Sequence, residues 1–170
     1  MDWNLSLRQI QLLEFTQKLI KIRCDHPNLH RRKFYQDRSI RGSAEKDIVW
    51  LRPDGQEMND EEWGLGWVRS LGVMLNGETL GDVDETGESI KDFTFLLMLN
   101  CHHEPIKFFP PKPGGAEKWE ILVDTKDPEL PADSRFCEPG DSIELVPLSL
   151  VLAREAKPPS ITGILSPELR

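Results

Sequence analysis

The segment DIVWLRPDGQEMNDEEWGLGWVRSLGVMLNGE, from Asp47 to Glu78, decides the fold of this chain. It opens with an apolar, β-branched and aromatic run at residues 48–51 and closes with a second such run at 71–75. Between them, Pro53-Asp54-Gly55 supplies a turn, because proline fixes φ and glycine accepts φ values that other residues resist. The order of strand, turn, short acidic helix and second strand predicts antiparallel β-structure with short connections.

Five further runs of the same kind follow downstream, separated by clusters of Pro, Gly, Asn and Asp such as Asn76-Gly77, Pro113-Gly114-Gly115 and Pro139-Gly140-Asp141. Successive strands without helices between them are typical of an antiparallel sandwich or barrel. The expected fold is therefore mainly β, an antiparallel β-sandwich of about seven to eight strands. The expected strands are 48–51, 71–75, 94–100, 106–109, 119–123, 142–145 and 149–153.

The N-terminal segment predicts a helix that is apolar on two sides. Asn4 or Ser6 can cap its start, and His26-Pro27 ends it, because proline lacks the backbone donor that a helix needs. A helix with two apolar sides requires packing partners on both. The first row comprises Leu5, Leu12, Phe15, Leu19 and Ile22, and the second comprises Ile10, Leu13 and Ile20.

Length and charge limit the domain count and the classes of partner. The 170 residues allow one buried core and an appended arm, and they fall short of the roughly 200 or more residues of a (β/α)₈ barrel. We expect a helical arm at 1–33, a sandwich domain at 34–156 and a flexible tail at 157–170. With 21 basic against 29 acidic residues, neither nucleic acid nor an anionic membrane is an expected partner.

The cysteines and the N-terminus favour the cytoplasm. Cys24, Cys101 and Cys137 form an odd set with no CxxC pair, which indicates free thiols in a reducing compartment. The N-terminus MDWNLSLRQIQ has no basic region followed by a long apolar stretch, so no signal peptide is expected. No apolar run approaches the ~20 residues that span a bilayer.

Several segments together resemble, in collinear order, the bacterial glycogen debranching enzymes of the isoamylase type, in the α-amylase superfamily of glycoside hydrolases. Residues 47–78 resemble the start of their C-terminal β-sandwich, and the resemblance continues through FLLMLNCHHEPIKFFPP at 95–111 and KWEILVDT at 118–125 to LVPLSLVLARE at 145–155. LLEFTQKLIKIRCDHPNLHRRKFY at 12–35 looks like the last helix of the catalytic (β/α)₈ barrel. The resemblance implies a C-terminal accessory domain that carries one helix of the barrel.

The resemblance also implies a parent reaction, the hydrolysis of α-1,6-glucosidic branch linkages in glycogen or limit dextrin. This chemistry needs two carboxyl groups about 5 Å apart across the scissile bond. The family's nucleophilic Asp, acid/base Glu and third Asp match no position in this chain, so we expect no catalytic residues and no activity of the chain alone. The run Asn100–Glu104 matches the family's third-acid motif only in part, because it ends in Glu and follows a sandwich strand. Structural support of the barrel is the expected role, without a cofactor.

Two polar clusters are candidate sites. Cys101, His102 and Glu104 are competent metal ligands, but adjacent histidines on an extended chain point to opposite sides, and no second ligand pair has zinc-like spacing. We therefore expect no metal site and expect Cys101 to pack as a small apolar residue. The acidic residues 60–62 after Asn59 fit a helix N-terminus, where negative charge is favourable.

Trp63 and Trp67, at i and i+4, are the candidate carbohydrate-binding residues. They could form a stacking platform, which would suit an alternative function as an autonomous carbohydrate-binding β-sandwich for α-glucans. They could instead fill the seam between the short helix and the sandwich or barrel. The partners to consider are thus the catalytic barrel, an α-glucan and a second copy of this chain that forms a homodimer through the N-terminal helix.

Overall fold

The computed structural model describes residues 4–35, 46–65, 68–78, 80–112, 117–138 and 140–156. Helix α1 (Leu7–Asp25) and a 3₁₀ turn η1 (Pro27–Leu29) come first, and a short helix α2 (Asp60–Trp63) lies between the first two strands. The strands are β1 (Ile48–Leu51), β2 (Ser70–Leu75), β3 (Phe95–Asn100), β4 (Ile106–Phe108), β5 (Trp119–Asp124), β6 (Phe136–Cys137), β7 (Ile143–Leu145) and β8 (Ser149–Glu155).

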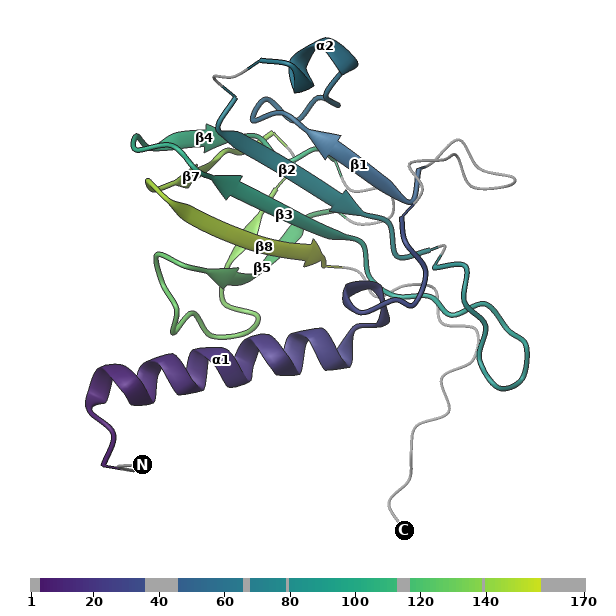
Figure 1. The fold of residues 1–170 in the computed structure, drawn as a ribbon, viewed down its shortest axis with the longest axis horizontal. Helices are drawn as coiled ribbons and strands as arrows, with labels where there is room; N and C mark the ends of the chain where they lie inside the picture. The colour runs from purple at the N-terminus through teal and green to yellow at the C-terminus, as the bar shows by residue number, and fades with distance from the viewer. Residues whose placement is uncertain are drawn as a thin grey trace.

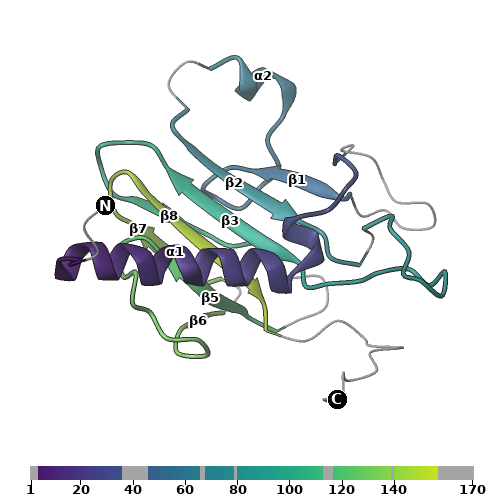
Figure 2. The same cartoon turned by 60° about the horizontal axis from the view of Figure 1, so that its bottom comes forward.

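These strands form two antiparallel sheets. The large sheet has the order β1-β2-β3-β8-β5-β6, and β4 pairs with β7 in a small second sheet. Figure 1 shows α2 above the large sheet and α1 below it, and Figure 2 shows α1 running across the strands. The expected mainly antiparallel β fold with an N-terminal helix is confirmed.

Seven strands lie within two residues of their expected bounds, and β6 was missed. Two residues are too few to show an alternating pattern, and β6 exists because Cys137 pairs with Trp119 of β5. Residues 113–115, Pro139 and the tail at 157–170 lie outside the described residues. Within the described ranges, no helix combines the length and the apolar character that crossing a bilayer requires.

The main core lies between the two sheets. Alternation along β3 and β8 points Met98 and Val151 toward the small sheet, where Phe108 and Leu145 meet them. Trp119 is fully buried in the same core, and its Nε1–H donates to the carbonyl of Pro111 at 2.8 Å. Trp119 is therefore a core residue of β5.

A β-bulge in β5 enlarges the second apolar face of the large sheet. Ile121 pairs with Ala153, but Val123 pairs with Leu152, which leaves Leu122 as the extra residue. Leu122 and Val123 therefore join Phe95 in a second buried cluster. Phe15 and Ile22 of α1 pack against this cluster, so the helix covers the face that the small sheet leaves open.

Gly72 in β2 sits at a point of very close packing. A Cβ at this position would lie 2.5 Å from Cζ of Phe108 and 3.0 Å from Cβ of Leu51. These atoms belong to the main core, in which side chains interdigitate with little free space. Only a hydrogen atom fits there.

Gly72→Ala is expected to lower the free energy of unfolding by about 1–3 kcal/mol, because the added methyl overpacks the core. Gly64→Ala is the matched control, since its φ of −82° is helical and its nearest new neighbour, the carbonyl of Glu61, would lie 3.4 Å away. This control is expected to change the free energy by no more than about 0.5 kcal/mol. Urea unfolding measures both, and equal effects would contradict the packing argument.

Candidate functional site

Helix α1 presents one face to the sandwich. Phe15 and Ile22 contact the second cluster, as described above, and two polar side chains on the same stripe reach the loop after β5. Gln11 Nε2 donates to Glu129 Oε1 at 3.0 Å, and Lys18 Nζ donates to the carbonyl of Leu130 at 2.7 Å. The partial burial of Lys18 lowers its pKa, although the nearby carboxylate of Asp127 opposes this shift.

The opposite face of α1 is open. Ile10, Leu13 and Ile20 expose 38%, 46% and 57% of their surface, and no residue of the helix is buried. The second apolar row of the sequence is thus not covered by the sandwich. The first row was expected to act as one stripe, but only Phe15 and Ile22 of its helical members pack on the second cluster, while Leu12 and Leu19 are exposed at its flank.

Both ends of α1 match the sequence-based expectation. Ser6 is the N-cap, and the side-chain oxygen of Gln9 accepts from its backbone N–H at 2.8 Å and from its hydroxyl at 2.9 Å. His26 is the C-cap, and Pro27 starts η1. The helix therefore ends where the chain must turn toward the sheet.

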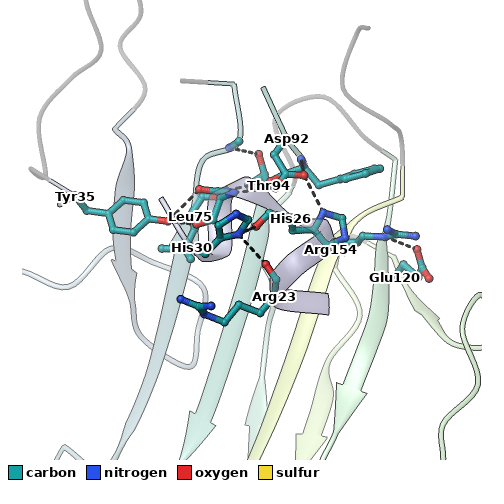
Figure 3. Close-up of polar contacts among 12 residues, drawn as sticks. Arg23, His26, His30, Tyr35, Leu75, Asp92, Thr94, Glu120 and Arg154 are labelled. Carbon is teal, nitrogen blue, oxygen red and sulfur yellow. Dashed lines mark hydrogen bonds and ion pairs between the residues drawn. The ribbon is translucent and has the colours of Figure 1, made fainter. Parts of the chain in front are cut away.

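A buried carboxylate, Asp92, ties this end of the helix to the sandwich (Figure 3). Its Oδ1 lies 2.9 Å from Nδ1 of His26 and accepts from the backbone N–H of Phe93 at 2.7 Å. Its Oδ2 accepts from the backbone N–H of Asn28 at 3.0 Å. The His26 ring also packs edge-on against Phe95 with a centroid distance of 4.9 Å. This junction joins the helix end to the entrance of β3 by both polar and apolar contacts.

Asn28 extends the junction to β2. Its side-chain amide donates to the carbonyls of Leu75 and Phe93, each at 3.1 Å. The hydroxyl of Tyr35 donates to the backbone carbonyl of Asn28 at 2.7 Å, and burial raises the pKa of Tyr35. Gly77 permits this packing, since a Cβ there would lie 2.1 Å from the carbonyl oxygen of Asp92. Sequence reasoning missed the junction, because nothing local links residues 28 and 92.

A second buried carboxylate, Glu120, is also held by partners. Arg154 Nε donates to its Oε2 at 2.9 Å, and the backbone N–H of Asp133 reaches its Oε1 at 3.3 Å. The Arg154 guanidinium lies 4.7 Å from the ring centre of Phe93 (Figure 3 shows the ion pair). Because its donors hold the carboxylate of Glu120 in one fixed geometry, this arrangement suits structural support better than proton transfer.

The acidic residues at 60–62 form the first turn of α2, as the sequence indicated. Asn59 Oδ1 accepts from the Glu62 backbone N–H at 3.0 Å, and Glu62 Oε2 accepts from the Asn59 backbone N–H at 2.9 Å, a reciprocal capping box. Arg52 donates to Glu62 and to Asp54, each at 2.6 Å. Its hydrogen bonds lower the pKa of both carboxyl groups, and they in turn raise the pKa of Arg52.

Trp63 lies at the end of α2 with 51% of its surface exposed. Its ring meets Trp50 of β1 edge-on, with the centroids 5.4 Å apart and an interplanar angle of 82°. It borders a cavity of about 280 Å³ that also touches Ser70 and Cys101. Trp67, its proposed companion in a stacking platform, lies outside the described residues.

The run Asn100–Glu104 is a turn, and it corrects two expectations. The side chain of Asn100 holds this turn by accepting from the backbone N–H of His102 at 2.9 Å and donating to the carbonyl of Glu104 at 2.9 Å. Because the chain bends here, the rings of His102 and His103 stack, with their centroids 4.1 Å apart, instead of pointing to opposite sides. Cys101 is exposed, so the expectation that it packs as an apolar residue was wrong.

All three cysteines are free thiols, and burial raises the pKa of Cys137. Across the part of the chain that the structure describes, no three His, Cys, Asp or Glu side chains are grouped to hold a metal ion.

The chain is similar to known carbohydrate-active proteins. A family model described as "Isoamylase, C-terminal" matches residues 47–145. Two relatives called "Glycogen operon protein GlgX homolog", from Mycobacterium tuberculosis and Mycobacterium bovis, are 40% identical over 129 residues, which is 75% of this chain and 18% of each relative. An isoamylase from a Flavobacterium species is 23% identical over 123 residues, 72% of this chain and 15% of that protein.

A solved structure agrees at the level of the fold. A pullulanase from an Anoxybacillus species, crystallised with maltotetraose, superposes with a TM-score of 0.50 and 14% identity over 91% of this chain and 17% of the pullulanase chain. This chain therefore spans less than a fifth of the length of the relatives that it matches. Since the family model covers more than half of its residues, the chain belongs to the isoamylase C-terminal domain family.

Proposed function

We propose that this chain is the C-terminal accessory domain of a glycogen debranching enzyme, and that it supports the catalytic barrel through the open face of α1. The parent reaction is the hydrolysis of α-1,6-glucosidic branch linkages in glycogen or limit dextrin. One observation carries the proposal: Ile10, Leu13 and Ile20 are exposed on the side of α1 opposite to the sandwich. The family and the glycogen-operon name of the mycobacterial relatives support the enzyme class.

The energetics favour a partner for this face. Each apolar side chain that becomes fully buried contributes about 1.5–3 kcal/mol relative to an exposed one. Three such side chains on one helix face form a patch of the kind that marks an interaction surface. The Asp92 junction holds the C-terminal end of α1 against the sandwich. The open face of the helix therefore has a fixed orientation before a partner binds.

A cytoplasmic location belongs to the same proposal. The three cysteines are free, which suits a reducing compartment, and the mycobacterial relatives are named for a glycogen operon.

A chimera tests the accessory role. The matching segment of the Mycobacterium tuberculosis relative is replaced by this chain, and debranching of glycogen and thermal unfolding are measured. The triple change Ile10→Lys, Leu13→Glu and Ile20→Lys is expected to lower both activity and Tm, because it places charge in the proposed contact. The control Arg8→Ala with Glu14→Ala keeps the net charge of the helix and is expected to change neither. A chimera whose debranching activity and Tm are the same with and without the triple change would refute the contact. The isolated chain, assayed alone on glycogen, is expected to release no reducing sugar.

The isolated chain is expected to self-associate, because its open helix face has no barrel to cover it. A two-fold dimer that uses the same patch on both copies is the simplest arrangement. Light scattering should show a dimer for the unmodified chain and for the Arg8→Ala, Glu14→Ala control, and a monomer for the triple variant. A monomeric unmodified chain would contradict this prediction.

Asp92→Ala is expected to lower the free energy of unfolding by about 1–3 kcal/mol, because it leaves buried donors at His26 and Asn28 without an acceptor. The control Glu85→Ala alters an exposed carboxylate and is expected to have little effect. Hydrogen exchange should also speed up in the last turn of α1 for Asp92→Ala. Unchanged exchange there would mean that the junction does not hold the helix.

A further inference from the structure

The corner between α2 and the neighbouring ends of β2 and β3 contains a groove that the proposed accessory role does not use. Two cavities of about 330 and 280 Å³ form it, and both are lined by Met58, Glu62, Leu65, Val68, Arg69 and Ser70. A mostly apolar wall with a few polar groups is typical of small-molecule sites. We propose that this α2 groove binds a neutral polyol, namely glucosyl units of an α-glucan chain, with Trp63 as the stacking surface and Ser70 as a hydrogen-bonding group.

Ser70 supplies the first argument. It is the first residue of β2, opposite Asn100 of β3, and it is only 7% exposed. Its hydroxyl is buried and has no hydrogen-bond partner among the described residues. A buried hydroxyl is normally satisfied, because it can both donate and accept. Ser70 lines both cavities, so rotation of its side chain about χ1 would let a ligand hydroxyl in the groove satisfy it in either direction.

Trp63 supplies the second argument. Its edge-on contact with Trp50 restrains the indole, while half of its surface stays open beside the smaller cavity. A sugar ring has apolar C–H faces and a polar rim, so an aromatic face next to hydrogen-bonding groups matches both parts of it. The groove offers these two features side by side.

Charge selects a neutral ligand. Arg52 and Arg69 in the lining are matched by Glu62 and Glu104. Arg52 already donates to Glu62 at 2.6 Å, so its charge is compensated within the wall. A phosphate or a free cation would meet as much repulsion as attraction there, whereas hydroxyl groups can donate to the carboxylates and accept from the guanidinium groups.

The groove lies away from the open face of α1. Figure 1 shows α2 above the large sheet and α1 below it, so a glucan could occupy the groove while α1 packs on a partner. The inference rests on the proposed function only for the choice of an α-glucan among polyols. It deepens that function by giving the accessory domain a second contact with the substrate class.

Titration of the 170-residue chain with maltoheptaose, followed by calorimetry and tryptophan fluorescence, tests the groove. We expect saturable binding with a Kd of about 1 mM or tighter. Trp63→Ala is expected to weaken binding about tenfold and Ser70→Ala about threefold, which are losses on the scale of one or two weak contacts. Phe136→Ala is the matched control, because it removes an exposed aromatic side chain on β6, and it should bind like the unmodified chain.

The outcomes separate this inference from the accessory role. No saturation by about 10 mM maltoheptaose, or equal affinity in Trp63→Ala, Ser70→Ala and the unmodified chain, overturns the site. Tighter binding of inorganic phosphate than of maltoheptaose overturns the neutral ligand. Circular dichroism confirms folding, and Ser70→Ala removes only an unpartnered hydroxyl. None of these results depends on the light scattering or the chimera, so each proposal can fail alone.

Discussion

The buried carboxylate of Asp92 is the contact on which the arrangement of α1 depends. A buried charge is costly unless donors surround it, and here they come from His26, Asn28 and Phe93. Two of these belong to the turn that ends the helix and one to the entrance of β3, so these hydrogen bonds can form only when helix and sheet meet in one orientation. Gly77 makes the approach possible because no Cβ fits beside the carbonyl of Asp92. The direction of α1, and hence the face that it leaves open, follows from this junction.

The large sheet explains why a helix is needed there. Alternation in β3 and β8 points one set of side chains toward the small sheet, and the bulge at Leu122 turns the end of β5 toward the other side. A sheet that is apolar on both faces needs cover on both. The small sheet packs on the first, whereas α1 contributes Phe15 and Ile22 to the second and keeps its other apolar residues outside.

Two surfaces of different chemistry result, and they suit different partners. The outer face of α1 is a row of aliphatic side chains, which favours a protein surface that excludes water. The α2 groove combines an indole, an unpartnered hydroxyl and balanced charges, which favours a small hydroxylated ligand. Membership of the isoamylase C-terminal family is compatible with both proposed partners.

The sequence by itself determined the positions of seven strands, the bounds of α1, its second apolar row and the Asn59 cap of α2. These features depend on periodicity, turn residues and cap residues within a few positions of one another, which a single sequence displays directly. The tertiary structure alone decided the Asp92 junction, strand β6, the bulge at Leu122, the exposure of Cys101 and the unpartnered hydroxyl of Ser70. Each of these depends on contacts between segments that are far apart in the chain. His26 and Asp92, for example, are 66 residues apart, and no local sequence pattern predicts that they form a hydrogen bond.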